Sequence, residues 1–143
     1  MKIGIIGYGV VGKAAAHTLQ KSYDVVKYDK FFDYDSFDKL HDCDFVFITV
    51  PTPFDCKAWK VDDLAIIDSL DNLERIRFKN IVIIKSTIPT GFTDRYSSQY
   101  DLEIVFNPEF LRESTTPNED FENQDTVVIG TNNRGSFSSV KKM

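Results

Sequence analysis

The chain has 143 residues, the size of one ordinary domain with a hydrophobic core of its own. Hydrophobic residues make up 42% and charged residues 27%, as in globular proteins, and the net charge of -5 argues against general nucleic-acid binding. No apolar run approaches the roughly 20 residues that cross a membrane, and Met1-Lys2 leads straight into a strand-like run. We therefore expect no nucleic-acid partner, no membrane partner and a cytoplasmic location.

The first thirty residues have the order strand, glycine turn, helix, strand and acid. Lys2–Ile6 is an apolar run that leads into Gly7–Gly12, where GYGVVG is a complete G-x-G-x-x-G. Apolar and small residues at helical spacing then predict a helix over residues 10–21. Asp24–Tyr28 follows as a second short strand, and Asp29 stands directly after it. This order is typical of a dinucleotide-binding βαβ unit.

The glycines and the start of the helix have separate roles in such a unit. Gly7 allows the tight turn, Gly9 allows a pyrophosphate to approach the backbone, and Gly12 allows helix and strand to pack closely. The N–H groups of Val10 and Val11 at the start of the helix would face the phosphates. The alternative is a purely structural glycine turn in an α/β protein that binds nothing.

Asp29 and Lys30 indicate which dinucleotide binds. Asp29 lies 22 residues after Gly7, close to the spacing of an acid that hydrogen-bonds a ribose 2′-hydroxyl. Lys30, beside it, could instead hold a 2′-phosphate. We favour NAD over NADP as the cofactor because the Asp29 carboxylate would repel that phosphate.

The middle of the chain continues the alternation of strands and helices. After a short helical turn over residues 37–40, the apolar run 44–50 has the pattern of a central parallel strand. It ends in Pro51-Thr52-Pro53, which must leave the sheet because proline cannot donate to a strand ladder. A loop over residues 54–60 follows, and residues 61–73 have the spacing of an amphipathic helix.

The remaining predicted elements are three strands and a short helix, at residues 80–84, 102–106, 126–129 and 92–99. The alternation predicts a Rossmann-type doubly wound parallel α/β sheet of about six strands in the order 3-2-1-4-5-6. We expect a single domain over residues 1–130, with residues 131–143 as a C-terminal tail or the start of a truncated connecting helix. The polar segments after the strands would then share the carboxyl edge, where open α/β sheets bind ligands.

Four motifs, GYGVVG, VPTP, KSTIPTGFT and NPEFLRES, occur in this order. Together they resemble the N-terminal domain of the UDP-glucose/GDP-mannose dehydrogenases, from Met1 to about Gly130. The last two motifs are the more specific, and they look most like the UDP-glucose branch. The resemblance implies that NAD oxidises the C6 alcohol of a UDP-glucose-like nucleotide sugar to a carboxylate in two hydride transfers.

The resemblance also implies catalytic roles for three residues. Thr87 matches a threonine beside the cofactor that helps to hold a catalytic water. Glu109 matches an acid of the site, and Glu113 matches the glutamate of proton transfer and thioester hydrolysis. Two acids four residues apart could share an active-site rim, where a partly buried glutamate gains a raised pKa suited to base chemistry. Without the resemblance, the two acids would be a solvated helical pair.

Further contacts follow from the same resemblance. The sugar nucleotide would contact the segment that contains the two acids, mainly through the backbone of Phe110, Leu111 and Arg112. The ribose and nicotinamide of the cofactor would be bordered by Pro51, Thr52, Ser86 and Thr87.

The chain departs from the family pattern in two places. Residues 30–43, between the second and third predicted strands, replace a segment of several dozen residues, so part of the structure that covers substrate or cofactor is missing. The family also continues into a substrate-binding domain with a cysteine nucleophile. Cys43 lies at the amino edge of the predicted sheet, and Cys56 does not match the position of that nucleophile. We expect two reduced thiols and no metal site.

Three hypotheses for the function follow. The first is the NAD-binding half of a nucleotide-sugar dehydrogenase, incomplete without a complementary substrate-domain chain. The second is a free-standing NAD(H)-binding module without dehydrogenase activity. The third, an unrelated Rossmann-type reductase, is disfavoured by the last two motifs. An apolar face left exposed at the edge of the sheet would favour a homo-oligomer.

Overall fold

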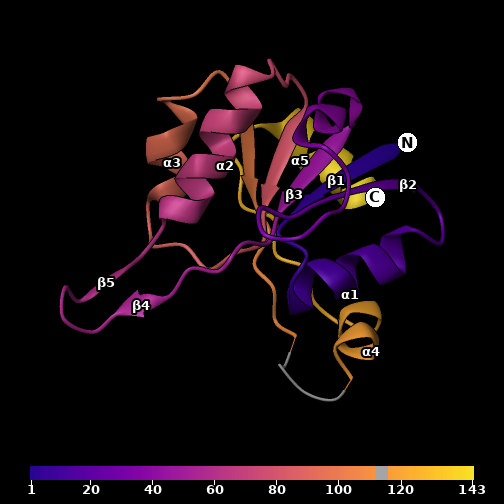
Figure 1. Cartoon of the computed structure of the whole chain (residues 1–143), viewed down its shortest axis with the longest axis horizontal. Coiled ribbons are helices and arrows are strands. Elements are labelled where there is room, and N and C mark those ends of the chain that lie inside the picture. The colour runs from indigo at the N-terminus through magenta and orange to yellow at the C-terminus, as the bar shows by residue number, and fades with distance from the viewer. Residues whose placement is uncertain (112–115) are drawn as a thin grey trace.

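A computed structural model describes residues 1–111 and 116–143 of the chain. The described residues form one five-stranded parallel sheet in the order β2-β1-β3-β6-β7 (Figure 1). Its strands are β1 (Lys2–Ile6), β2 (Asp24–Tyr28), β3 (Phe45–Ile48), β6 (Ile81–Ile84) and β7 (Glu103–Phe106).

Helices cover both faces of the sheet (Figure 1). One face carries the 3-10 helix η1 (Phe37–Asp42) with α2 (Leu64–Arg75) and α3 (Phe92–Ser97). The opposite face carries α1 (Val10–Leu19), α4 (Pro117–Glu122) and α5 (Arg134–Lys142). A small antiparallel hairpin of β4 (Phe54–Asp55) and β5 (Lys60–Val61) projects away from the sheet. No helix in the described part of the chain is long and apolar enough to cross a membrane.

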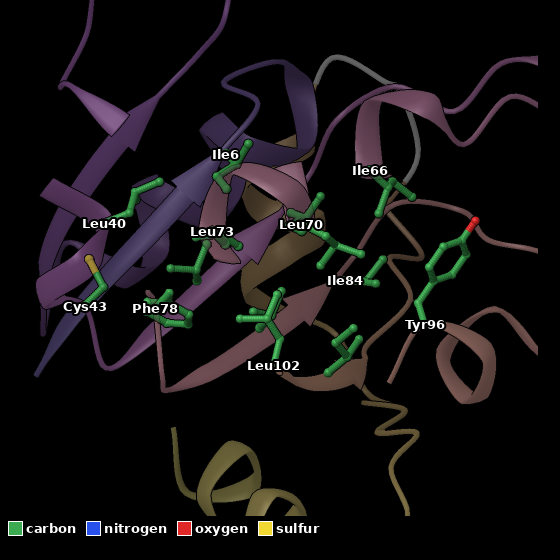
Figure 2. Close-up of a cluster of buried hydrophobic side chains, with 14 of the residues drawn as sticks. Ile6, Leu40, Cys43, Ile66, Leu70, Leu73, Phe78, Ile84, Tyr96 and Leu102 are labelled. Atoms are coloured by element: carbon green, nitrogen blue, oxygen red, sulfur yellow. The ribbon is translucent and has the colours of Figure 1, made fainter. Parts of the chain in front are cut away.

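The larger hydrophobic core lies between the sheet and the elements η1, α2 and α3 that cover one of its faces (Figure 2). Helix α2 contributes Ile66, Leu70 and Leu73, all fully buried, at the spacing that places side chains on one helical stripe. On the opposite face, Ala15 and Ala16 of α1 pack in a second core cluster with side chains of the sheet. The small alanine side chains bring α1 close to the sheet and so fix the position of the glycine turn before it.

The strand register aligns the carboxyl ends of all five strands. Ile6 lies opposite Tyr28 on one side and Ile48 on the other. Ile48 lies opposite Ile84, which in turn lies opposite Phe106. The loops after these strands therefore leave the sheet along one edge, as the sequence predicted.

The Rossmann-type parallel sheet predicted from the sequence is confirmed, and over the described residues it differs from the order 3-2-1-4-5-6 in the place of the third strand and in the absence of the sixth. The third strand, β3, pairs with β1 instead of lying outside β2. The burial of β3 fits this central place, because all four residues of Phe45–Ile48 are buried, as in a parallel strand with helices over both of its faces. The partly polar β2 takes the edge, and the short η1 segment carries the chain across β1.

The sixth predicted strand, residues 126–129, is not a strand. Of residues 126–130, only Gly130 pairs with β7, through an isolated antiparallel bridge to Phe106. The carbonyl of Val128 accepts a hydrogen bond from the Asn107 side-chain amide at 2.8 Å, and the Val127 side chain is 61% exposed. The segment therefore contacts the end of β7 through backbone groups without extending the ladder of the sheet.

Two smaller predictions also need correction. The predicted loop 54–60 forms most of the β4–β5 hairpin, where Phe54 pairs with Val61 and the two aromatic rings of Phe54 and Trp59 meet edge to face. The predicted helix 61–73 consequently starts later, at Leu64, because Val61 belongs to the hairpin. Residues 134–142, for which the sequence predicted a tail or the start of a connecting helix, form the helix α5, whose Val140 packs into the second core cluster.

Candidate functional site

The glycine turn between β1 and α1 is packed between two strands. Gly7 has φ of 90°, a left-handed conformation that glycine adopts without strain. Its N–H donates to the Tyr28 carbonyl at 2.9 Å, and a Cβ here would lie 2.9 Å from the Thr49 carbonyl oxygen. The Thr49 hydroxyl donates to the Gly7 carbonyl at 2.6 Å. The turn therefore has no space for a side chain at Gly7.

Gly9 and Gly12 have opposite surroundings. A Cβ on Gly12 would lie 2.9 Å from Thr49 Oγ1 and closer still to the Gly7 carbonyl oxygen, so only glycine lets α1 approach this closely. A Cβ on Gly9 would meet no atom within 4 Å. Gly9 is the N-cap residue of α1, and no side chain among the described residues caps this end. Open space thus lies before free N–H groups, an arrangement that binds anions.

Asp29 ties the end of β2 to this turn. One carboxylate oxygen accepts a hydrogen bond from the Tyr8 N–H at 2.8 Å, and the other accepts from the Phe31 N–H at 2.9 Å. A carboxylate has about four acceptor positions, so each oxygen keeps capacity for a further donor such as a ribose hydroxyl. The predicted acid is therefore fixed in direction, next to the predicted pyrophosphate site.

A crevice of about 830 Å³ opens where the turn, β2, β3 and α2 meet. The predicted cofactor residues that line it are Gly7, Gly9, Asp29, Lys30 and Pro51. Helix α2 forms the opposite wall, with side chains that include Leu64, Ile67 and Asp68. The crevice lies between β1 and β3, from which the chain winds in opposite directions across the sheet. Such switch points are where open α/β sheets bind nucleotides.

A second polar cluster lies at the ends of β6 and β7 and is buried. Lys85 Nζ lies 3.0 Å from Glu109 Oε2 and donates to Asn107 Oδ1 at 2.9 Å. The Lys85 and Glu109 side chains are 3% and 6% exposed. Burial lowers the pKa of Lys85, and the neighbouring Glu109 carboxylate opposes that shift. The Lys85 ammonium also lies 5.1 Å from the centre of the Phe121 ring of α4.

The other oxygen of Glu109 holds the loop that follows it. Glu109 Oε1 accepts hydrogen bonds from the N–H groups of Phe110 at 2.9 Å and Leu111 at 3.1 Å. It also accepts a hydrogen bond from the Gln124 side chain. Glu109 is therefore a buried, paired carboxylate that joins β6, the loop after β7 and the segment after α4.

Comparison with known proteins identifies the family. The NAD binding domain of the UDP-glucose/GDP-mannose dehydrogenase family matches residues 19–143. The chain belongs to this family. The match begins after the glycine turn of residues 7–12, so the family match does not include this turn and its description depends on the structure alone. NAD is the cofactor for which this family's domain is named.

Two relatives named UDP-glucose 6-dehydrogenase are about one-third identical to this family member over the aligned residues. UDP-glucose 6-dehydrogenase of Rickettsia conorii is 36% identical over 112 residues, which cover 73% of this chain and 25% of that protein. The enzyme of the same name from Campylobacter jejuni is 33% identical and covers 80% of this chain and 38% of that protein. The chain therefore spans only about a quarter to two fifths of these relatives.

Solved structures support the fold. Pyrroline carboxylate reductase of Plasmodium falciparum, solved with NADP bound, aligns with 99% of this chain and 53% of that chain, at a TM-score of 0.69 and 16% identity. A 3-hydroxyacyl-CoA dehydrogenase of Archaeoglobus fulgidus also covers 99% of this chain and 52% of its own, at a TM-score of 0.67 and 15% identity. At these identities the likeness concerns the fold alone.

The predicted site residues of this family member divide into those around the crevice and those at the ends of β6 and β7. Val10 and Val11 begin α1 at the mouth of the glycine turn. Ser86 is buried and its hydroxyl donates to the Val50 carbonyl at 2.7 Å, beside the end of β3, whereas Thr87 is exposed. Thr52 is half-buried after Pro51.

The predicted substrate segment is only partly described. Phe110 is 61% exposed, and Leu111 is half-buried. Arg112 and Glu113 lie outside the described residues. The Glu109 carboxylate is buried against Lys85, so Glu109 is not one of a solvated helical pair of acids, and its sharing of an active-site rim with Glu113 stays a prediction.

Sequence reasoning missed Lys85 and the α2 wall. Lys85 follows Ile81 and Ile83 at a spacing of two residues, so its side chain continues the buried face of β6. A lysine at that position in an apolar strand indicates a buried partner, but the sequence does not say which acid it is. The α2 wall had no such signal, because it results from the pairing of β3 with β1.

Proposed function

We propose that the chain binds NAD in the crevice, with the pyrophosphate at the start of α1 and the adenosine ribose at Asp29. The observation that carries this proposal is the open space in front of Gly9, where a Cβ would meet nothing within 4 Å. The uncapped first turn of α1 supplies N–H donors there, and the Asp29 carboxylate is held beside them by the Tyr8 N–H. Pro51, Thr52 and Ser86 would border the rest of the cofactor.

We further propose that the chain serves as the NAD-binding half of a UDP-glucose-type 6-dehydrogenase, which oxidises a sugar C6 alcohol to a carboxylate. Bound NAD would accept the hydride. The exposed Thr87 would hold a water molecule beside the reacting carbon, and Glu113 would transfer protons. Family membership and the names of the two relatives support this assignment.

Within this proposal, Glu109 orients the substrate segment. Its ion pair with Lys85 fixes the carboxylate, and the carboxylate in turn binds the N–H groups of Phe110 and Leu111. Those residues, with Arg112, would contact the nucleotide sugar mainly through the backbone. A substrate domain would complete the site, because the chain spans 25% of the Rickettsia conorii enzyme.

Calorimetric titration with NAD tests the binding step. Gly9→Ala should weaken NAD binding about tenfold or more, because its methyl group occupies the space for the pyrophosphate. Gly130→Ala is the matched control, since its Cβ would make an ordinary contact 3.4 Å from Phe106 on another edge of the sheet. No NAD binding at millimolar cofactor, or equal affinity of both variants, would overturn the proposed site.

An NADH-absorbance assay with UDP-glucose tests the catalytic proposal. We expect little or no complete oxidation by this chain alone, and turnover after addition of a complementary substrate domain. NAD binding without turnover under both conditions would favour the alternative, a free-standing NAD(H)-binding module.

A further inference from the structure

An ion pair crosses the mouth of the crevice. Lys30, directly after Asp29 at the end of β2, places Nζ 3.1 Å from Oδ2 of Asp68 on α2. Both residues line the crevice. The pair therefore joins its two walls beside the acid that we assign to the adenosine ribose.

The charges around the crevice are strongly unequal. Among the described residues that line it, four are acidic, namely Asp29, Asp62, Asp68 and Asp71. Lys30 is the one basic residue in the same set, and its ammonium is engaged by Asp68. A ligand that brings further negative charge to this mouth meets carboxylates and, among the described lining residues, no cation free of a carboxylate partner.

NAD and NADP differ at the 2′-position of the adenosine ribose, which we place beside these charged residues. NADP carries a phosphate on the 2′-oxygen of the adenosine ribose, where NAD has a hydroxyl. A hydroxyl can donate to Asp29, whereas a phosphate needs a positively charged partner. Among the described residues that line the crevice, Lys30 is the one that could supply the charge.

We propose that Asp68 selects NAD over NADP by holding Lys30 away from the 2′-position and by adding its own negative charge there. This inference rests on the proposed function, because it assumes that the dinucleotide lies in this crevice. It assigns to α2, which forms the wall of the crevice opposite the glycine turn, a direct role in the choice of cofactor.

Asp68→Asn tests this role because asparagine keeps the shape of the side chain and removes its charge. The affinities for NAD and NADP are measured by calorimetry at one fixed ionic strength. We expect the ratio of NADP affinity to NAD affinity to rise about tenfold. Asp24→Asn is the matched control, since Asp24 is an exposed acid at the opposite end of β2, and it should leave the ratio unchanged.

A second variant isolates the contribution of Lys30. The double variant Asp68→Asn/Lys30→Ala should lose most of the gain in NADP affinity, because the freed ammonium is removed. A ratio that stays within twofold of wild type in Asp68→Asn would overturn the inference while NAD binding itself survives. A gain that persists without Lys30 would overturn the role of that residue. Absence of NAD binding by the wild-type chain would overturn the proposed function and this inference together.

Discussion

Replacing Gly12 by alanine tests whether α1 is held against the glycine turn as the structure shows. The added Cβ would lie 2.9 Å from Thr49 Oγ1 and closer to the Gly7 carbonyl oxygen. Neither neighbour can move freely. The Thr49 hydroxyl is engaged with the carbonyls of Ile6 and Gly7, and the Gly7 N–H is bound to the carbonyl of Tyr28. Relief of the overlap therefore requires α1 to move away from the sheet.

Two opposing effects determine how much Gly12→Ala changes the free energy of unfolding. Overpacking of this kind costs about 3 kcal/mol at the upper end of its usual range. Because alanine is a better helix former than glycine, the substitution also stabilises α1 by about 1 kcal/mol. We therefore expect Gly12→Ala to lower the free energy of unfolding by about 2 kcal/mol, which corresponds to a fall in Tm of about 4–8 °C for a chain of this size. Gly9→Ala, where the Cβ meets nothing, should change the free energy of unfolding by less than about 1 kcal/mol.

Urea denaturation followed by far-UV circular dichroism measures both variants. The fluorescence of Trp59 is a poor probe because this side chain is already 80% exposed in the folded chain. The reasoning predicts that Gly12→Ala loses stability, whereas Gly9→Ala keeps its stability and loses NAD binding. Equal stability of the two variants would refute the close packing of α1 on the turn.

Three further predictions follow from individual contacts. Lys85→Met should lower the free energy of unfolding by about 3–5 kcal/mol because Glu109 stays buried without its cation, and adding Glu109→Gln should recover part of that loss; no recovery would contradict the pair. Iodoacetamide at about pH 8 should alkylate the exposed Cys56 and spare Cys43, since burial raises the pKa of the Cys43 thiol to about 11; mass spectrometry showing two native adducts would contradict this. Hydrogen bonds from the Lys39 side chain and the Lys27 N–H lower the pKa of Asp35 below its ordinary 3.8. Its contribution to stability is thus complete above that value and is lost as pH falls through the lowered pKa, so acid titration should destabilise Asp35→Asn less than wild type.

Local patterns in the sequence predicted most of the fold. The glycine turn, the first five apolar strands and the acid at position 29 are properties of short segments, and the structure contains each of them at or within a few residues of its predicted place. The parallel class followed from alternation alone. The apolar run Phe45–Ile48 indicated a strand covered on both faces, but its place beside β1 was not predicted.

Long-range pairing was not readable in the same way. Residues 126–129 have the composition of a strand, but Asn107 takes the Val128 carbonyl and only Gly130 meets β7. The partnership of Lys85 with Glu109 joins two motifs 24 residues apart, and no local periodicity reports such a contact. The wall that α2 gives to the crevice likewise depends on strand order, which local patterns do not determine.

The central claim, that NAD lies at the glycine turn, is tested most directly by NMR chemical-shift mapping with isotope-labelled chain. Titration with NAD should shift the amides of Gly9, Val10 and Val11, together with those of Asp29 and its neighbour Lys30. The amides of Thr93 and Asn132, in the separate cavity beside β7, should stay unchanged. Shifts confined to that cavity, with none at the glycine turn, would contradict the account.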